Sequence, residues 1–258
     1  MQTCGAARCQ ANINFVDLTG EDELPTPAQS VQAQEWKTTD LSERAVRELQ
    51  QAWSETGVLG HSLYQPSESM SVASFKKLRP GRWLTDECIN MFFAYLQGTD
   101  SRTLFMSTYF KNKLQTDTPL QVRAVLTKRL QTARLSFRQV NQILIPCNLR
   151  DNHWTLVSIR TDLKTILHYD SLGGSTTLVY DCLNWMQTVH ADEGLPFNRI
   201  QWTVGHGDSP VQTNGFDCGV FLCATALFLR AHLPLNFTAE QMPRIRQRLA
   251  STILSSLG

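Results

Sequence analysis

The hydrophobic positions of this chain predict two groups of helices on either side of a few short strands. Helical segments show apolar residues every three to four positions, whereas the strand segments are short and rich in β-branched residues. The expected helices cover residues 86–97, 104–114, 120–131, 178–189 and 219–232, and a last helix carries Ile245, Leu249 and Ile253. The expected strands cover residues 142–146, 154–159, 165–169 and 200–204. This order predicts an α+β fold, a small mixed β-sheet flanked by helices.

The first seventy residues have a different character from the rest. Residues 1–39 are polar, carry Pro25 and Pro27 and show no sustained periodicity, so we expect a flexible acidic tail. Residues 40–70 are expected to form a short helix over 41–54, which begins with a capping-box-like Asp40 and Glu43, followed by a linker. Residues 71–258 have the composition of a folded domain.

Length and composition narrow the class of protein. The chain has 258 residues, 42% of them hydrophobic, which is enough for one large domain or two small ones. Its seven cysteines are odd in number and scattered, which favours a reducing compartment, nucleus or cytoplasm, over a disulfide framework. No secretory signal is visible, and the apolar run at 219–229 is far shorter than the roughly 20 residues that span a bilayer. We therefore expect an intracellular protein that does not contact membranes.

The net charge of +1 conceals an asymmetry between the two parts of the chain. Residues 1–60 contain four Lys and Arg against nine Asp and Glu, a net charge of −5. Residues 61–258 contain the remaining 20 basic and 14 acidic residues, a net charge of +6. The basic residues are dispersed and no nucleic-acid-binding motif accompanies them, so we expect no nucleic-acid partner.

The segment at 212–221, QTNGFDCGVF, carries the strongest chemical signal. It places Cys218 at the start of an apolar run that is expected to form a buried helix. A thiol there lies at the positive end of the helix dipole, which favours the nucleophilic thiolate. The flanking Gly215 and Gly219 could leave room for a substrate backbone. The alternative is a small core cysteine that only packs.

A cysteine nucleophile needs a base, and the base needs a group that orients it. His153 begins one predicted strand and Asp170 ends the next, so a hairpin would bring them together. His168 lies within an apolar strand and is better interpreted as a core histidine, while His206 lies in a loop. Asp217 would oppose a neighbouring thiolate as an acid, and a helix-capping role fits it better.

No metal site is expected. Neither Cys4 with Cys9 nor Cys218 with Cys223 has the close spacing of paired zinc ligands, and no second pair accompanies them. The chemistry outlined above needs no cofactor.

Several motifs, in the same order along the chain, resemble the ubiquitin-like-protein proteases, specifically the sentrin/SUMO-specific branch. The resemblance runs from about residue 70 to the end. The segments that carry it are 82–90 (RWLTDECIN), 106–110 (MSTYF), His153-Trp154, Asp170-Ser171-Leu172, 212–219 (QTNGFDCG) and 241–248 (QMPRIRQR).

The resemblance implies a catalytic cysteine, a general base and an orienting carboxylate at Cys218, His153 and Asp170. The Gln212 side chain and the Cys218 backbone N–H would form the oxyanion hole, in which the loss of one donor typically costs about 10²–10³ in rate.

The resemblance also implies three residues that bind the substrate. Trp83 and Trp154 match the family's aromatic clamp over a narrow channel, which selects a Gly-Gly tail, and Asp86 matches a position that contacts the modifier. Asp86 by itself is also typical of a helix N-cap. Thr85 and Ser107 stand where the family usually has Asn.

The tail adds a possible SUMO-interaction motif. Phe15, Val16 and Leu18 form a short β-prone run that is followed by acidic residues. Such a segment can add as a strand to an exposed sheet edge.

Together these features predict a monomeric thiol isopeptidase that cleaves after the C-terminal Gly-Gly of SUMO, with SUMO and SUMO-conjugated proteins as partners. One alternative keeps the same chemistry but acts on ubiquitin or a Nedd-type modifier. A form of this alternative is a secreted bacterial effector that acts inside a host cell. An acyltransferase and a non-catalytic SUMO-binding module are further alternatives.

Overall fold

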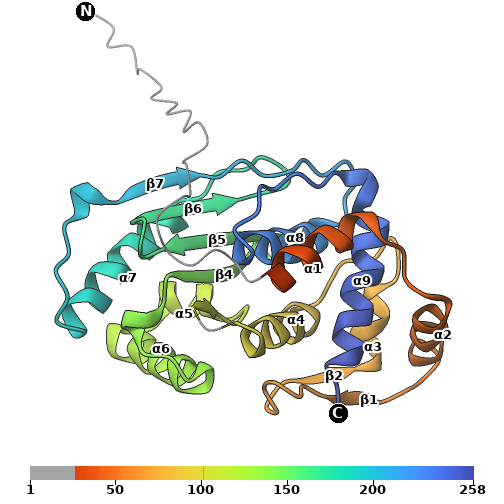
Figure 1. The fold of residues 1–258 in the computed structure, drawn as a ribbon. Helices are drawn as coiled ribbons and strands as arrows, with labels where there is room; N and C mark the ends of the chain where they lie inside the picture. The colour runs from red at the N-terminus through yellow and green to blue at the C-terminus, as the bar shows by residue number, and fades with distance from the viewer. Residues whose placement is uncertain (1–26, 101) are drawn as a thin grey trace, which may run out of the picture.

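The structure is a computed structural model that describes residues 27–258 except residue 101. Its centre is a five-stranded mixed sheet in the order β3-β4-β5-β6-β7 (Figure 1). The two outer pairs, β3 with β4 and β6 with β7, are parallel, and the inner pairs are antiparallel. The strands are β3 (Thr103–Phe105), β4 (Gln142–Leu149), β5 (His153–Arg160), β6 (Thr165–Tyr169) and β7 (Thr203–His206). The predicted α+β class, with a small mixed sheet between helices, is confirmed.

The sheet separates two hydrophobic cores because side chains alternate between its faces. Along β4, Leu144 enters the first core, while Ile143 and Ile145 enter the second. The catalytic layer, as we call the first, contains α4 (Asp86–Gly98), α8 (Cys218–Arg230) and α9 (Met242–Ser255). The opposite layer contains α5 (Phe110–Thr116), α6 (Pro119–Ala133) and α7 (Leu178–Asp192).

Helix α8 is the central element of the catalytic layer. Nearly all its residues are apolar and buried, as expected for a helix that is covered on every side. It lies between the sheet and α9 (Figure 1). Its first residue is Cys218, so the predicted cysteine at the N-terminus of a buried helix is confirmed.

The N-terminal part differs from the predicted flexible tail. Residues of α1 (Pro27–Thr38) form a helix in which Ala33 and Trp36 are buried, and Trp36 packs on Phe92 with ring centroids 5.3 Å apart. Two buried positions among residues 28–38 are too few to produce a visible hydrophobic period. Phe15, Val16 and Leu18 lie outside the described residues.

Residues 40–70 are more ordered than a linker. Helix α2 (Glu43–Ala52) begins after Ser42, whose side chain accepts from the Ala45 N–H, so Asp40 is not its cap. Strands β1 (Val58–His61) and β2 (Ser69–Ser71) pair with each other, and Ser62 forms a bridge with Leu257 near the C-terminus.

Two further elements differ from the prediction in type or starting point. The expected helix over 104–114 is divided, because Thr103–Phe105 pairs with β4 as a parallel strand and α5 begins only at Phe110. The expected strand over 200–204 begins at Thr203, after a 3₁₀ turn. The remaining short helical segments are α3 (Val72–Phe75) and 3₁₀ turns over Lys76–Leu78, Phe137–Gln139, Arg199–Gln201 and Ala239–Gln241.

Candidate active site

The start of β5 and the end of β6 meet at one edge of the sheet because the two strands are antiparallel neighbours. His153 is the first residue of β5, and Asp170 directly follows β6. The His153 Nε2 atom lies 2.6 Å from Asp170 Oδ1, a hydrogen bond between two side chains that are 16% and 5% exposed. The sequence prediction that a hairpin joins these two residues therefore agrees with the geometry.

The Asp170 carboxylate is fixed by backbone donors. The Leu172 N–H donates to Oδ1 at 2.8 Å, and the Gly174 N–H donates to Oδ2 at 3.0 Å. Burial alone would raise the pKa of Asp170, but the hydrogen bonds from His153 and the Leu172 N–H outweigh burial and lower this pKa. Asp170 is thus a rigid anionic acceptor at neutral pH.

His153 lies between Asp170 and Cys218. Hydrogen bonds to Asp170 and then to Cys218 raise the pKa of His153 to about 9, although burial acts in the opposite direction. Because Nε2 is occupied by Asp170, Nδ1 is the nitrogen left to face the sulfur. A protonated imidazole at neutral pH would stabilise a thiolate beside it.

Cys218 differs from the other described cysteines in its surroundings. It has a histidine partner and is the first residue of a 13-residue helix, where backbone N–H groups lack intrahelical acceptors. Cys88 and Cys147 are fully buried, and burial raises the pKa of their thiols to about 11 and about 12. Burial also raises the pKa of Cys182 and Cys223 well above the usual range. Only Cys218 among them is set up for nucleophilic chemistry.

The Gln212 side chain is held in one orientation. Its Oε1 accepts from the Ser171 hydroxyl at 2.9 Å, and its Nε2 donates to the Asn214 carbonyl. The Gln212 backbone N–H also donates to the Ser171 carbonyl at 2.8 Å. Since one amide hydrogen is used by Asn214, the second remains available to a ligand.

A buried ion pair supports the loop that precedes Cys218. Asp217 occupies the N-cap position of α8, but its side chain makes no capping hydrogen bond, so the predicted capping role is wrong. Its carboxylate instead accepts from Arg246 at 2.6 and 3.1 Å and from Asn214 Nδ2 at 2.8 Å.

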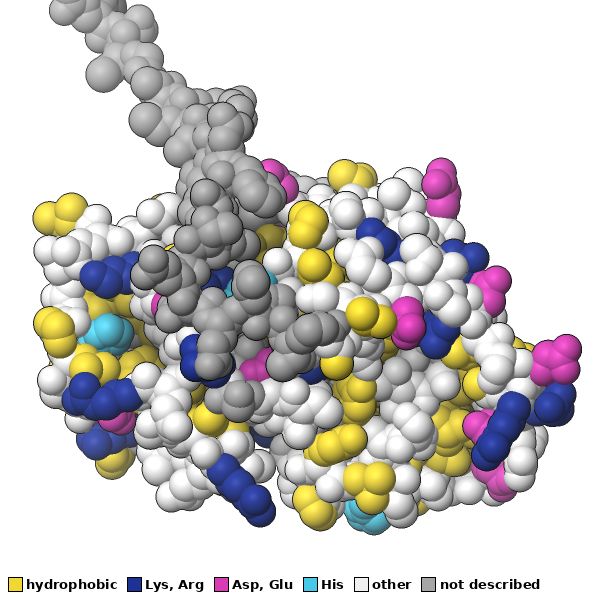
Figure 2. All heavy atoms as spheres, viewed as in Figure 1, with side chains coloured by type: hydrophobic (Ala, Val, Ile, Leu, Met, Phe, Trp, Pro, Cys, Tyr) yellow, Lys and Arg dark blue, Asp and Glu magenta, His cyan; other side chains and the backbone are white. Residues whose placement is uncertain are grey.

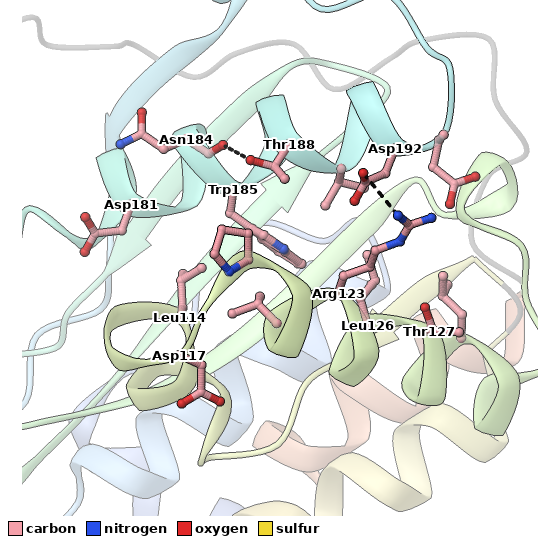
Figure 3. Close-up of a pocket in the computed structure, with 15 residues that line it drawn as sticks. Leu114, Asp117, Arg123, Leu126, Thr127, Asp181, Asn184, Trp185, Thr188 and Asp192 are labelled. Carbon is pink, nitrogen blue, oxygen red and sulfur yellow. Dashed lines mark hydrogen bonds and ion pairs between the residues drawn. The ribbon is translucent and has the colours of Figure 1, made fainter.

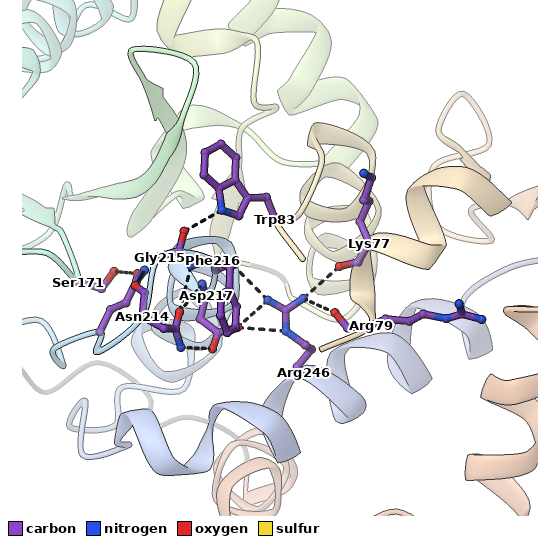
Figure 4. A network of polar contacts seen from close by, with 10 residues as sticks. Lys77, Arg79, Trp83, Ser171, Asn214, Gly215, Phe216, Asp217 and Arg246 are labelled. Carbon is purple, nitrogen blue, oxygen red and sulfur yellow. Dashed lines mark hydrogen bonds and ion pairs between the residues drawn. The ribbon is translucent and has the colours of Figure 1, made fainter. Parts of the chain in front are cut away.

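Arg246 extends this network into the surrounding chain. Its guanidinium also donates to the carbonyls of Lys77 and Arg79 (Figure 4). Sequence reasoning assigned no role to Arg246, because its partner lies 29 residues away and no local signal marks it.

Both predicted clamp residues line a cleft of about 290 Å³, which also includes Asn152, the chain neighbour of His153, but not Cys218, His153 or Gln212 themselves. Trp83 is 52% exposed, and its Nε1 donates to the Gly215 carbonyl at 2.7 Å (Figure 4). Trp154 is buried, and its Nε1 donates to the Leu84 carbonyl at 3.0 Å. The two hydrogen bonds hold one indole at the surface and the other at the wall of the cleft.

Asp86 lines the same cleft, at the first position of α4. Thr85, not Asp86, occupies the N-cap position of this helix, so the N-cap interpretation of Asp86 is wrong. The Tyr109 hydroxyl donates to the Asp86 carboxylate, and this hydrogen bond is the largest of the contributions that raise the pKa of Tyr109 to about 12.

The two glycines beside Cys218 have different surroundings. A Cβ at Gly219 would lie 2.9 Å from Leu84 Cβ, so this glycine allows α8 to approach Leu84 and does not make room for a substrate. A Cβ at Gly215 would meet nothing within 4 Å, so the space there is open.

The competing histidines are placed elsewhere. His168 is 1% exposed, and burial lowers its pKa to about 4, which agrees with a neutral core histidine. His206 is the last residue of β7 and packs edge-on against His168.

Within residues 27–258, residue 101 apart, no group of three or more His, Cys, Asp or Glu side chains could hold a metal ion. In the same part of the chain, no helix combines the length and apolar character that crossing a membrane requires.

The basic side chains are dispersed on the visible face of the molecule. Lys and Arg side chains occur at several separate places on the face shown in Figure 2.

Comparisons with known proteins point to one protease family. The Ulp1 protease family, C-terminal catalytic domain, matches residues 82–257. Ubiquitin-like-specific protease 1 of Saccharomyces cerevisiae is 29% identical over 187 residues, 72% of this chain and 30% of that protein. Human sentrin-specific protease 2 is 28% identical over 235 residues, 83% of this chain and 37% of that protein.

A solved structure is similar as well. The C-terminal Ulp1 protease domain in complex with Smt3, the yeast ortholog of SUMO, superposes with a TM-score of 0.74 at 28% identity and covers 84% of this chain and 96% of that one. The present chain thus spans about a third of the length of the two relatives named above but nearly all of the solved protease domain.

Proposed function

Because this chain belongs to the Ulp1 protease family, we propose that it is a thiol isopeptidase that cleaves after the C-terminal Gly-Gly of SUMO. The reaction would release SUMO from lysine side chains of conjugated proteins and trim SUMO precursors. The observation that carries this proposal is the placement of His153 between Asp170 and Cys218, next to a cleft walled by tryptophan. We further propose that the enzyme acts inside the cell, in the nucleus or cytoplasm.

In the first half of the reaction, the Cys218 thiolate attacks the carbonyl carbon of the terminal glycine and forms a C–S bond. Protonated His153 then gives its proton to the departing lysine nitrogen as the C–N bond breaks. The products are a free amine and a thioester between SUMO and Cys218.

In the second half, neutral His153 takes a proton from water while the water oxygen attacks the thioester carbon. The C–S bond breaks, and the Cys218 thiolate and the imidazolium are restored with release of the carboxylic acid of SUMO, which loses its proton to solvent. Asp170 keeps the imidazole in one orientation throughout and stabilises the imidazolium each time it forms.

Both halves develop negative charge on the glycine carbonyl oxygen. The remaining amide hydrogen of Gln212 and the backbone N–H of Cys218 are the donors we assign to this oxygen. Ser171 and Asn214 hold the Gln212 amide in place before substrate arrives, so little reorganisation is needed in the transition state.

The cleft supports selection of the tail. Trp83 and Trp154 would close over the C-terminal tail of the modifier and leave no room for side chains, which favours two successive glycines. We assign Asp86 to a contact with the folded part of the modifier. The Tyr109 hydroxyl restrains the Asp86 carboxylate for that contact.

The proposed function is tested with three fluorogenic substrates, in which SUMO, ubiquitin or a Nedd-type protein carries aminomethylcoumarin at its C-terminus. We expect kcat/KM to be highest for SUMO by at least about tenfold. A higher kcat/KM for ubiquitin or the Nedd-type protein would support the proposed reaction but contradict SUMO as the preferred substrate. No hydrolysis of any of the three would overturn the protease itself.

We also propose that Phe15, Val16 and Leu18 bind a second SUMO and raise its local concentration on multiply modified targets. The triple substitution to Ala should raise KM for SUMO chains and leave kcat/KM for SUMO-aminomethylcoumarin unchanged. Equal KM values for chains in both proteins would contradict this role.

A further inference from the structure

A second pocket lies in the opposite layer, across the sheet from α8. It has a volume of about 260 Å³ and lies between α6 and α7, with α5 at one end (Figure 3). Its floor consists of apolar side chains from all three helices: Leu114, Val122, Leu126, Leu130, Trp185 and Val189. The Trp185 ring is held by Phe110, with centroids 4.8 Å apart. We call this pocket the α6–α7 groove.

The rim of the α6–α7 groove is acidic. Four of its lining residues are acids, Asp117, Asp181, Asp192 and Glu193, and one, Arg123, is basic. The surrounding chain has the opposite balance, since residues 61–258 contain 20 basic and 14 acidic residues. Acids therefore outnumber basic residues in the lining of this groove, and three further cations contact its rim: Lys113 at Asp117, Arg138 at the Glu193 carbonyl and Arg199 at Asn184.

The charges on the rim are held only loosely. The Arg123–Asp192 pair spans the groove at 3.3 Å, with side chains 53% and 30% exposed (Figure 3). Asp117, the C-cap residue of α5, is 3.4 Å from Lys113 of that helix, and Asp181 accepts from Gln115 at 3.1 Å. Exposed pairs of this kind contribute about 0–1 kcal/mol, so a cation from a ligand can replace them at little cost.

We propose that the α6–α7 groove binds a segment of a partner protein, an amphipathic helix with bulky apolar side chains flanked by Lys or Arg. The apolar side chains would enter between α6 and α7, and the cations would pair with the rim carboxylates. An apolar floor does not suit a simple polyvalent cation, and an acidic rim repels nucleic acid. The volume lies just below the roughly 300–1,000 Å³ of small-molecule pockets and suits a few anchoring side chains.

The position of the groove allows a segment bound there and a substrate in the cleft to be held at the same time. Because the sheet separates α7 from α8, a segment in the groove leaves the cleft lined by Trp83 and Trp154 open. A conjugated target that carries this segment would be bound at two sites at once, which raises its effective concentration at the active site. This consequence rests on the proposed function, whereas binding to the groove does not.

Binding is tested directly by fluorescence anisotropy with three labelled 14-residue peptides. The probe is the helical Leu/Lys peptide LKKLLKLLKKLLKL, and its partners replace every Leu by Ala or every Lys by Glu. We expect the Leu/Lys peptide to bind at least about tenfold more tightly than either partner. Equal affinity for the Ala/Lys peptide would overturn the apolar part of the proposal, and equal affinity for the Leu/Glu peptide would overturn its electrostatic part.

Two groove variants and one control locate the binding site. The triple variant Asp181→Asn, Asp192→Asn, Glu193→Gln should weaken binding of the Leu/Lys peptide at least about tenfold. The control triple Glu43→Gln, Glu48→Gln, Glu55→Gln makes the same change of charge in and next to α2 and should leave binding unchanged. Equal weakening in both triples would overturn the proposal, since it would show attraction to the overall charge alone.

The second groove variant is Thr188→Arg, which places a large cation at an exposed position in the lining of the groove. It should also weaken binding at least about tenfold while SUMO-aminomethylcoumarin hydrolysis stays within about twofold of the parent. The melting temperature of each variant confirms that it folds. Unchanged peptide binding in folded Thr188→Arg would overturn the assignment to this groove.

Discussion

The catalytic layer and the opposite layer use ion pairs in different ways. In the catalytic layer, Arg246 and Asp217 are 2.6 Å apart, with side chains only 2% and 7% exposed. In the opposite layer, Arg123 and Asp192 are 3.3 Å apart, with side chains 53% and 30% exposed. A buried pair is costly to break and therefore fixes the loop before Cys218, whereas an exposed pair can exchange its partners. The buried pair therefore holds the site residues in place, whereas the more exposed pair lies on a surface where a ligand can replace one partner.

The largest effect is expected from two cysteines of the same helix. Cys218→Ala should lower kcat/KM for SUMO-aminomethylcoumarin by about 10⁴-fold or more, since the proposed nucleophile is lost. Cys223→Ala, five residues along α8 and fully buried, should keep most of the activity. Steady-state kinetics on both variants distinguish them, and similar losses in the two would place the chemistry elsewhere.

The two ion pairs should differ in their contribution to stability. Arg246→Met removes one member of a buried pair and should lower the free energy of unfolding by about 3–5 kcal/mol. Arg123→Met removes one member of an exposed pair and should cost less than about 1 kcal/mol. Urea denaturation of both variants measures the difference. Equal costs would mean that burial does not distinguish the two layers.

Substitution of Gln212 is expected to lower kcat without a matching change in KM. Gln212→Ala should lower kcat by about 10²–10³ with little change in KM, because the lost hydrogen bond acts on the developing oxyanion. The matched variant in the opposite layer is Gln115→Ala, which removes the contact with Asp181 and should leave kcat unchanged. A rise in KM without a fall in kcat would instead assign Gln212 to ground-state binding.

The smallest predicted effect is a shift in the pH profile. Because His153 has a pKa of about 9, kcat/KM should fall as the pH rises through 9 and the imidazolium is lost. Asp170→Asn should move this alkaline limb to lower pH, since the hydrogen bond to Asp170 is the largest cause of the raised pKa. Asp181→Asn in the opposite layer should not move it. An unshifted limb in Asp170→Asn would mean that Asp170 does not control His153.

The same raised pKa links folding to pH. The folded value lies above the ordinary value of 6.5, so the interactions of protonated His153 contribute to stability in full below about pH 6.5. This contribution is lost as the pH rises through about 9. Thermal unfolding of the parent and of Asp170→Asn across this range should converge at the alkaline end.

Much of the catalytic layer could be predicted from local sequence. The apolar run after Cys218 predicted a buried helix, and the adjacent strands placed His153 near Asp170, because both signals depend on residues close together in the chain. The roles expected for Gln212 and Trp83 came only from the resemblance to a known family, because the hydrophobic pattern does not distinguish these two residues.

Other features depend on contacts between distant segments. Helix α1 was missed because only Ala33 and Trp36 become buried, and only against the rest of the fold. Residues 103–105 are a strand because β4 provides a parallel partner, although their apolar character also suits a helix. The Asp217–Arg246 pair and the α6–α7 groove likewise arise only when segments far apart in sequence meet.

The central claim is that Cys218, His153 and Asp170 act together at one edge of the sheet. The most direct measurement is to label the protein with SUMO that carries a C-terminal vinyl sulfone, and to map the modified residue by mass spectrometry in the parent and in His153→Ala. We predict modification at Cys218 in the parent and a rate at least about 100-fold lower in His153→Ala. Modification of Cys88 or Cys223 instead, or equal rates in the two proteins, would contradict the account.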